Sequence, residues 1–433
     1  MLGANKETKI SKAQIIVTSC SRRSLELVQV KNFLLGNGYS LSSNDWVVDP
    51  DADLILLSTC GFTNAAEDFG FETLHRIQET KKPGAKAVLG GCIPKINPDR
   101  VLREFDGPTF SPQSYSQLNE IVGAKHRFEE FKRPNTFGKS YVSPLIHDAQ
   151  KAIGILKTFD GSFSGLAYIS QRLDNGFRQR YIRTKYANLC KENTFYIQVQ
   201  EGCSMHCNYC AIRMAIGPLR SRLIDTILEE FKTGLDNGYK HFQLTGDNAG
   251  SYGLDIGTNM GKLLERILEF EGDFDLDLTD INPVYLPLII EPVKRLCIEK
   301  KIASLYIPIQ SGNRRILKLM GRDCDMDTVK QMLIVIKRLA PRGFSLGTSL
   351  IVGFPSETLD ELNDSIQFCN EADFDWVWCH SFSARPETPA AALQGQISPE
   401  EILRRARLVR SRLDGNSIVT TADDSAGSRT CQG

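Results

Sequence analysis

The strongest constraint in this sequence is a regular alternation of short apolar segments with amphipathic segments between residues 195 and 411. The amphipathic segments, such as IDTILEEFKTGL, carry apolar residues at helical spacing. Strands that alternate with helices form a parallel sheet, because each helix carries the chain back to the edge where the next strand begins. The expected strands are FYIQVQE (195–201), HFQLTGD (241–247), DLDLTDI (275–281), SLYIPIQ (304–310), SLGTSLIV (345–352) and DWVWCHSF (375–382). These six strand–helix units predict a partial (βα)6 barrel, which is two units short of the closed form.

Residues 1–123 show the same alternation on a smaller scale. Their apolar runs are QIIVTSC (14–20), DLILLSTC (53–60) and AKAVLGGC (85–92), with helical patterns between them. Near-continuous apolar strands are typical of a parallel sheet that is covered on both faces. We therefore expect an N-terminal open parallel α/β sheet domain, followed by the barrel at 195–411.

Two segments lack this pattern. Residues 124–194 are polar and irregular, and we interpret them as a linker with an inserted element. Residues 412–433 are small and polar, which predicts a disordered tail.

Composition narrows the setting of the chain. No stretch approaches the roughly 18 apolar residues of a membrane span, so we expect a cytoplasmic protein without a membrane partner. Cytosolic thiols are kept reduced, so the 12 cysteines favour metal ligation or redox chemistry over a disulfide framework. Because 52 basic residues balance 52 acidic ones, any RNA contact would need a local basic patch.

The first cysteine motif follows the first strand of the predicted barrel. The segment EGCSMHCNYC places Cys203, Cys207 and Cys210 in the spacing C-x3-C-x2-C. A zinc site would want a fourth protein ligand, and His206 is poorly directed beside Cys207 within so short a loop. A four-iron cubane instead accepts three cysteines and leaves one iron for an exogenous ligand. The spacing favours such a cluster, while a structural zinc or three unrelated cysteines stay open as alternatives.

A second set of cysteines ends the three apolar runs of the N-terminal domain. Cys20, Cys60 and Cys92 stand at the same topological position, and such strand ends converge at one sheet edge. Each also precedes a helix, whose N-terminus would favour thiolate over thiol. These positions predict a second cluster, and the alternative is that all three are ordinary buried thiols. We interpret the other cysteines as core or surface thiols: Cys190, Cys297, Cys324, Cys369, Cys379 and Cys431.

These motifs resemble a known family over nearly all of residues 14–410. The C-x3-C-x2-C loop after the first strand resembles the radical S-adenosylmethionine (SAM) superfamily, and a preceding three-cysteine domain resembles its methylthiotransferases. The blocks similar to family signatures are STCGFTNAAEDF (58–69), EGCSMHCNYC (201–210), IPIQSGNRRILKLMGR (307–322), LIVGFPSET (350–358) and SARPETPAA (383–391).

The resemblance implies an enzyme that inserts sulfur into an unactivated C–H bond and methylates it. Each cysteine set would bind one 4Fe–4S cluster, one SAM would donate the methyl group and a second would supply the radical. An electron donor such as flavodoxin or ferredoxin is then required. The residues implied in SAM binding are Thr245, Gly246, Asp247, Gln310, Ser311 and Arg222. No residue type in the sequence identifies a catalytic general base, and radical hydrogen abstraction needs none at that step.

The substrate is indicated by one block and one charged segment. LTGDNAGSYGLDIGTN (244–259) resembles the branch that acts on threonylcarbamoyladenosine next to the tRNA anticodon. The Arg-rich segment 172–185 either contacts tRNA phosphates or is a solvated linker. Arg385 either touches substrate or forms a surface salt bridge, and Trp378 and His380 fit packing roles.

Three departures from the family pattern keep other substrates open. Residues 412–433 replace the β-rich TRAM-type RNA-binding domain of the family, so we expect no TRAM domain here. Ser349 stands where Asp is common, and Glu387 replaces Gly in an R-P-G-T-P pattern. The first alternative is a methylthiotransferase for a protein or ribosomal peptide. The second is an iron–sulfur protein for electron transfer or binding, without SAM chemistry.

Overall fold

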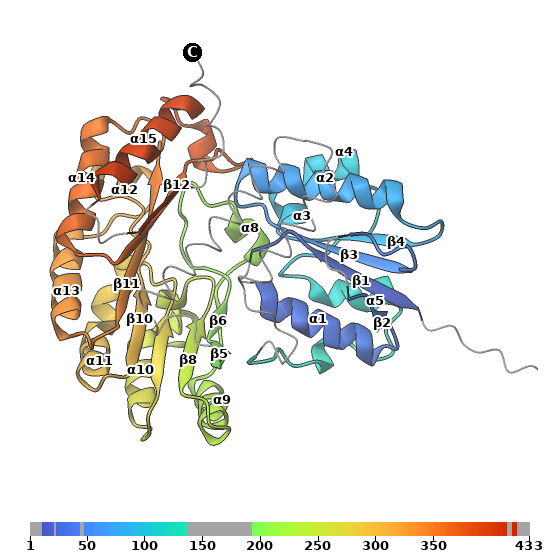
Figure 1. Cartoon of the computed structure of the whole chain (residues 1–433), viewed down its shortest axis with the longest axis horizontal. Helices are drawn as coiled ribbons and strands as arrows, with labels where there is room; N and C mark the ends of the chain where they lie inside the picture. The colour runs from blue at the N-terminus through green and yellow to red at the C-terminus, as the bar shows by residue number, and fades with distance from the viewer. Residues whose placement is uncertain (1–10, 21–22, 44–46, 137–192, 414–417, 422–433) are drawn as a thin grey trace, which may run out of the picture. The chain divides into compact units, whose positions relative to one another are not determined.

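The computed structural model describes residues 11–20, 23–43, 47–136, 193–413 and 418–421. Contacts divide the chain into two compact units, whose described parts are residues 11–136 and 193–421 (Figure 1). Each unit is built on a parallel sheet, which confirms the predicted fold class. The two units are described separately below.

The sheet of the first unit has four strands in the order β2-β1-β3-β4, and all of them are parallel. Its strands are β1 (Lys12–Val17), β2 (Ser40–Leu41), β3 (Leu54–Thr59) and β4 (Lys86–Gly91). Its helices are α1 (Ser24–Gly36), α2 (Asn64–Thr80), α3 (Ile93–Ile96), α4 (Pro98–Glu104) and α5 (Leu118–Val122), with 3-10 turns η2 (Tyr115–Gln117) and η3 (Phe128–Glu130).

Both faces of this sheet are covered, as the apolar runs predict. Successive residues of β3 alternate between two hydrophobic clusters, because side chains of a strand point to opposite faces in turn. Leu56 packs in the cluster that contains Phe33 of α1. Its neighbour Leu57 packs in the cluster that contains Leu74 of α2. A strand buried on both sides has no solvent-facing positions, which explains the apolar run Leu54–Leu57.

The first unit extends past its predicted end at residue 123. Phe128 of η3 is buried in the cluster of α1, and its ring lies 5.5 Å from that of Phe33. Phe131 makes an edge contact with the same ring at 5.7 Å. Residues 124–131 of the predicted linker therefore belong to this core. Residues 137–192, including the Arg-rich segment 172–185, lie outside the described residues.

The six predicted strands of the second unit are confirmed, and they pair in parallel and in sequence order. They are β5 (Thr194–Gln198), β8 (His241–Thr245), β9 (Asp275–Leu278), β10 (Ile302–Tyr306), β11 (Ser345–Val352) and β12 (Trp376–Ser381). Strand β13 (Ile418–Thr421) adds a seventh parallel strand beside β12. The sheet order runs from β13 to β5, and these two edge strands do not pair with each other.

Strand β13 corrects part of the prediction of a disordered tail. Its sequence IVTT consists of β-branched residues, which favour extended backbone. The prediction weighed the average polarity of the tail and overlooked this run, so it was wrong for Ile418–Thr421. Arg412 ends helix α15 (Pro399–Arg412) and Leu413 follows it, and residues 414–417 and 422–433 lie outside the described residues.

A layer of helices covers one face of the second sheet (Figure 1). The long helices are α9 (Ile224–Asp236), α10 (Met260–Leu268), α11 (Leu286–Ile298), α13 (Met326–Leu339), α14 (Leu359–Glu371) and α15 (Pro399–Arg412). Shorter elements are β6 (Gln200–Glu201), α8 (Ile212–Ile216), β7 (Arg220–Ser221), η4 (Ala249–Ser251), η5 (Leu254–Ile256), η6 (Pro283–Tyr285), α12 (Arg314–Leu319) and η7 (Pro389–Ala392).

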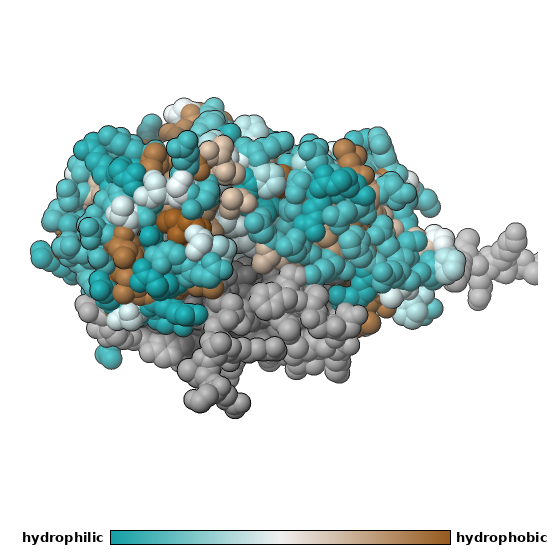
Figure 2. Space-filling model, turned by 90° about the horizontal axis from the view of Figure 1, so that it is seen from above, coloured by the Kyte–Doolittle hydropathy of each residue, from teal (hydrophilic) through white to brown (hydrophobic). Residues whose placement is uncertain are grey.

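Among the described residues, no helix is long and apolar enough to cross a membrane. The face seen in Figure 2 is mostly hydrophilic, with small separate hydrophobic areas. Exposed large apolar residues such as Leu102, Leu223 and Ile298 are scattered, which is normal for a protein surface.

Candidate functional site

The structure brings the three N-terminal cysteines together at the carboxyl edge of the first sheet. Cys60 follows β3 directly and Cys92 follows β4, and the backbone N–H of Cys92 donates to the carbonyl of Thr59 at 3.1 Å. Cys60 and Cys20 share a side-chain hydrogen bond. This bond, burial and the nearby thiols of Cys20 and Cys92 raise the pKa of Cys60 well above its usual value of 9.0.

The prediction that a helix N-terminus favours the thiolate was wrong for Cys60. Helix α3, which begins after Cys92, has only four residues, and α2 begins four residues after Cys60. The pKa of Cys60 is raised rather than lowered, because the thiol is buried beside two others. A thiol of this kind loses its proton when a metal binds to the sulfur, because the metal ligand is the thiolate.

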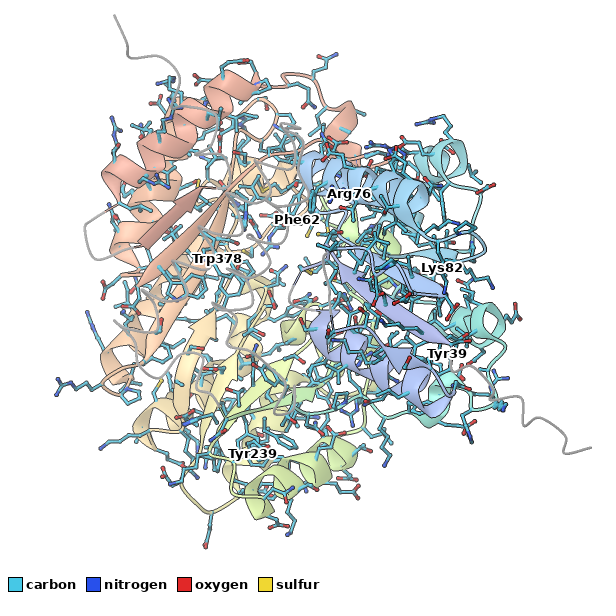
Figure 3. The ribbon with its side chains drawn as sticks, turned by 45° about the vertical axis from the view of Figure 1, so that its right-hand side comes forward. Tyr39, Phe62, Arg76, Lys82, Tyr239 and Trp378 are labelled. Carbon is cyan, nitrogen blue, oxygen red and sulfur yellow. The ribbon has the colours of Figure 1, made fainter. Side chains whose placement is uncertain are left out.

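A glycine fixes the position of Cys92. Gly91 has a φ of +93°, and a Cβ atom at this residue would lie 2.3 Å from the carbonyl oxygen of Thr59. Residues with a side chain rarely adopt such a φ, and a residue without Cβ allows this close approach of two strands. At the same edge, Phe62 is 45% exposed two residues after Cys60 (Figure 3).

In the second unit, the loop 202–211 that carries the C-x3-C-x2-C motif is held at both ends. The N–H of Gly202 donates to the carboxylate of Asp247 at 2.8 Å, at the end of β8. The N–H of Cys203 donates to the carbonyl of Gly217 at 3.1 Å. Gly202 has a φ of +74°, and a Cβ there would overlap the backbone of Pro218.

Two of the three thiols of this loop accept backbone or amide N–H groups. The sulfur of Cys203 accepts the N–H of Met205 at 3.4 Å and the side-chain amide of Asn248 at 3.6 Å. The sulfur of Cys210 accepts backbone N–H groups of Arg213 and Ile212. Donors aimed at sulfur stabilise thiolate ligands and tune the cluster that they bind.

The third thiol, that of Cys207, accepts the guanidinium of Arg322 at 3.9 Å. Burial raises the pKa of Cys210 to about 11, and the nearby thiols of Cys207 and Cys203 contribute to the increase. Burial also raises the pKa of Cys203. The thiols of Cys203, Cys207 and Cys210 therefore lie near one another, and N–H donors contact each sulfur.

Three cysteine thiols that lie near one another and accept N–H groups are a donor set that an iron–sulfur cluster can use. In a cubane each cysteine binds a different iron, so its ligands stand further apart than those of one zinc ion. The residues present therefore fit an iron–sulfur cluster.

The residues implied in SAM binding fall into two groups. Thr245, Gly246 and Asp247 lie at the carboxyl end of β8, beside the cluster loop. One oxygen of Asp247 is already engaged by that loop, as described above. Gln310 follows β10, has a φ of +69° and leaves its buried Oε1 without a hydrogen-bond partner.

Ser311 and Arg222 have protein partners in the structure. The hydroxyl of Ser311 lies 3.1 Å from that of Ser365 and accepts the N–H of Asn313. The guanidinium of Arg222 donates to both carboxylate oxygens of Glu230, at 2.7 and 3.0 Å. These contacts favour anchoring roles for both residues, and their contact with SAM stays a prediction.

The sequence motifs did not indicate Gln200 as a residue of the site. Its side chain is fully buried, and neither its Oε1 nor its Nε2 has a hydrogen-bond partner. The amide packs against Gly246, where a Cβ would lie 2.9 Å from Nε2. A buried amide without partners costs on the order of 1–3 kcal/mol, so such a group indicates a ligand that supplies the partners. Its position three residues before Cys203 was the available signal.

The remaining predictions concern two strand ends. The alternative of a surface salt bridge for Arg385 was wrong, because the side chain is only 2% exposed. Trp378 of β12 packs against Tyr306 and Trp376, with ring centroids 5.4 and 4.9 Å apart, as expected of a packing residue (Figure 3). The ring centroids of His380 and Trp378 lie 6.5 Å apart in an edge arrangement.

Comparisons with known proteins match both units. Residues 197–369 match the radical SAM superfamily, and residues 12–110 match the uncharacterized protein family UPF0004. The threonylcarbamoyladenosine tRNA methylthiotransferase MtaB of Thermotoga maritima is 33% identical over 385 residues, which cover 87% of this chain and 78% of that protein. The chain belongs to the methylthiotransferase family. It is therefore an enzyme of the radical SAM type that uses SAM and an iron–sulfur cluster.

Other comparisons leave the substrate of this methylthiotransferase open. A ribosomal protein uS12 methylthiotransferase RimO of Caldicellulosiruptor saccharolyticus is 29% identical, covering 83% of this chain and 74% of that protein. A solved radical SAM methyltransferase, TsrM of Kitasatospora setae with tryptophan and a SAM analogue bound, has a TM-score of 0.54. It covers 88% of this chain and 74% of that chain at 13% identity, so it shows the fold alone.

The methylthiotransferase also has a cavity of about 700 Å³ between α12, α13 and α14. Asp323, Asp325, Asp364 and Glu371 line it with Arg314 and Lys330. No residue predicted to bind a cluster or SAM is among its lining residues. This cavity lies in the helix layer and takes no part in the site.

Proposed function

We propose that this methylthiotransferase modifies a tRNA adenosine next to the anticodon, of the threonylcarbamoyladenosine type. It would insert sulfur into an unactivated C–H bond and methylate that sulfur. Two 4Fe–4S clusters would serve the reaction, one on Cys20, Cys60 and Cys92 and the other on Cys203, Cys207 and Cys210. A flavodoxin or ferredoxin would supply electrons, and the cytoplasm is the expected location.

The observation that carries the proposal is the arrangement of donors around the second cysteine set. Each sulfur of Cys203, Cys207 and Cys210 accepts at least one N–H group within the second unit. When bound there, a cluster with SAM supplies a radical that abstracts substrate hydrogen. The first set, gathered at one sheet edge, supports a second cluster from which sulfur would be delivered.

The residues of the chain would bind and orient SAM beside that loop. Gly246 leaves room for the amide of Gln200, whose buried Oε1 and Nε2 have no hydrogen-bond partner in the chain and could bind SAM. The Oε1 of Gln310 is a further acceptor at the carboxyl end of the sheet. Asp247 accepts a hydrogen bond from Gly202 and would so hold the start of the cluster loop at the end of β8.

The tRNA substrate is favoured by the relative at 33% identity that is named for it. The alternative is a protein or ribosomal peptide substrate, which the RimO relative at 29% identity supports. A tRNA substrate and a protein substrate require the same sulfur insertion and methylation, so only a direct assay of each substrate distinguishes them. Membership of an enzyme family argues against the reading as a binding protein without SAM chemistry.

Mass spectrometry of nucleosides tests the substrate. We expect methylthio-modified threonylcarbamoyladenosine in tRNA from cells with the gene, and only the unmodified nucleoside in cells without it or with Cys203→Ala. Digests of ribosomal proteins from the same cells are measured in parallel. A methylthio group that depends on the gene in a ribosomal peptide, with unchanged tRNA, would replace the first proposal by the alternative.

Iron analysis tests the two clusters. After anaerobic reconstitution we expect about eight irons per chain, and about four in a triple alanine variant of either cysteine set. Cys324→Ser is the matched control, because this thiol is half-buried and belongs to neither set. Four irons in the intact chain, unchanged by the variant of Cys20, Cys60 and Cys92, would refute the N-terminal cluster.

A further inference from the structure

Arg322 is a buried cation in direct contact with the cluster loop. Arg322 follows the end of α12 in the sequence and is 7% exposed. One Nη donates to the sulfur of Cys207 at 3.9 Å and to the hydroxyl of Tyr209 at 3.2 Å. The other Nη donates to the carbonyl of Pro308 at 2.6 Å. All donors that contact a partner therefore point toward the cluster loop and the end of β10.

No carboxylate of the described chain forms an ion pair with Arg322. Two other buried arginines differ in this respect. Arg405 contacts Glu401 and Glu357, and Arg23 contacts Glu26. A buried guanidinium without a countercharge costs several kcal/mol and cannot be relieved by loss of its proton. The countercharge of Arg322 must therefore come from another kind of group.

Among the described contacts of Arg322, only Cys207 would carry negative charge at neutral pH, as a thiolate ligand. A tyrosine hydroxyl such as that of Tyr209 ordinarily ionises near pH 10 and stays neutral. The carbonyl of Pro308 is a dipole without net charge. A cysteine that binds iron does so as the thiolate, and an iron–sulfur cluster with three thiolates is an anion.

The segment that carries Arg322 is fixed to the same loop. The side-chain amide of Asn208 donates to the carbonyl of Leu319 at 2.8 Å, and its backbone N–H donates to that of Met320 at 2.9 Å. Gly321 has a φ of +71°, and a Cβ there would lie 3.0 Å from the carbonyl oxygen of His206. These contacts therefore hold the guanidinium of Arg322 in a fixed position relative to the cluster loop.

We propose that Arg322 is a positioning residue whose fixed positive charge balances the anionic cluster on Cys203, Cys207 and Cys210 and raises its reduction potential. This inference rests on the proposed function. In the step concerned, the oxidised cluster accepts one electron from a low-potential one-electron donor, and no covalent bond forms or breaks. The electron adds one negative charge, which a buried cation at this distance stabilises because the interior screens charge poorly.

The test is an anaerobic redox titration of the reduced-cluster EPR signal in the full chain. Cys20, Cys60 and Cys92 are replaced by alanine so that one cluster gives the signal. In Arg322→Gln we expect the equilibrium constant for reduction to fall at least tenfold, which for one electron is about 59 mV. Arg322→Lys keeps the positive charge, so its equilibrium constant for reduction should fall less. Arg314→Gln removes a 74% exposed cation nearby and should change the constant less than twofold.

The outcomes separate this inference from the proposed function. Full iron content in Arg322→Gln with a reduction constant within twofold of the parent would overturn the role of Arg322. An equal shift in Arg314→Gln would do the same, since net charge would then be the cause. Iron loss in Arg322→Gln that Arg322→Lys restores supports the proposal, whereas iron loss in both variants overturns it in favour of loop packing. Failure of the parent chain to cleave SAM would instead contradict the proposed function.

Discussion

The carboxylate of Asp247 accepts a hydrogen bond from the backbone N–H of Gly202 at 2.8 Å, which joins the end of the second strand of the barrel to the start of the cluster loop. Asp247→Ala should loosen this loop, because a charge-assisted hydrogen bond contributes about 1.5–3 kcal/mol. We expect faster loss of iron to an anaerobic chelator, measured by absorbance. Asp247→Asn keeps an acceptor and should lose iron at an intermediate rate. If both variants match the parent, the bond does not hold the loop.

Gln200→Leu should separate stability from cofactor binding. Leucine removes a buried amide that has no partner in the chain, so the unfolding free energy should rise by about 1–2 kcal/mol. The same change removes the partners offered to SAM, and its dissociation constant should rise roughly tenfold. Thermal unfolding and equilibrium dialysis with SAM measure the two effects. A variant that is less stable and binds SAM normally would show that Gln200 is a packing residue.

Gly91→Ala should destabilise the first unit by on the order of 3 kcal/mol. Alanine at a φ of +93° is strained, and its Cβ would meet the backbone of Thr59. Gly84→Ala is the matched control, because Gly84 has a φ of +81° and nothing within 4 Å. Gly84→Ala introduces backbone strain without steric overlap, so it should lower the free energy of unfolding by about 1 kcal/mol. Denaturant unfolding checks both, and equal losses would contradict the steric argument.

Glu387→Gly should stabilise the second unit. Glu387 has a φ of +58° after Pro386, in a turn closed by the N–H of Thr388 and the carbonyl of Arg385 at 3.2 Å. This is the position where a type II turn requires glycine. Relief of strain, less the greater freedom of glycine in the unfolded chain, leaves a gain of about 0.5–1 kcal/mol. Glu387→Ala keeps the strain, and a similar rise in melting temperature for both variants would exclude this cause.

Glu357 should make stability depend on pH. Burial raises its pKa from 4.5 to about 7, although the N–H of Gly353 and the guanidinium of Arg405 act in the opposite direction. The folded chain thus holds this proton more tightly than the unfolded chain. Its stabilising effect is complete below pH 4.5 and is lost as the pH rises to about 7, a change on the order of 3 kcal/mol.

Melting temperatures of the parent and Glu357→Gln between pH 4.5 and 8 check this dependence. Glutamine cannot ionise, so its advantage over the parent should grow with pH and level off above about 7. A difference that stays constant across this range would mean that Glu357 titrates alike in both states.

The sequence determined the parallel architecture. The continuous apolar run of β3 indicated a strand covered on both faces, and the six strands alternating with helices in the second unit indicated a parallel sheet. The spacing of Cys203, Cys207 and Cys210 also indicated their chemistry, because neighbours on a loop are neighbours in space. Local pattern carries this information, since period and spacing are properties of the chain itself.

The tertiary structure decided what pairs with what. Nothing local in the sequence showed that Arg322 reaches Cys207, which lies 115 residues earlier, or that Arg222 is engaged by Glu230. The expected effect of helix N-termini on Cys60 failed for the same reason, since burial and neighbouring thiols came from other strands. Charge and hydrogen-bond partners depend on the distance between segments that the fold brings together, and the order of residues along the chain does not contain that distance.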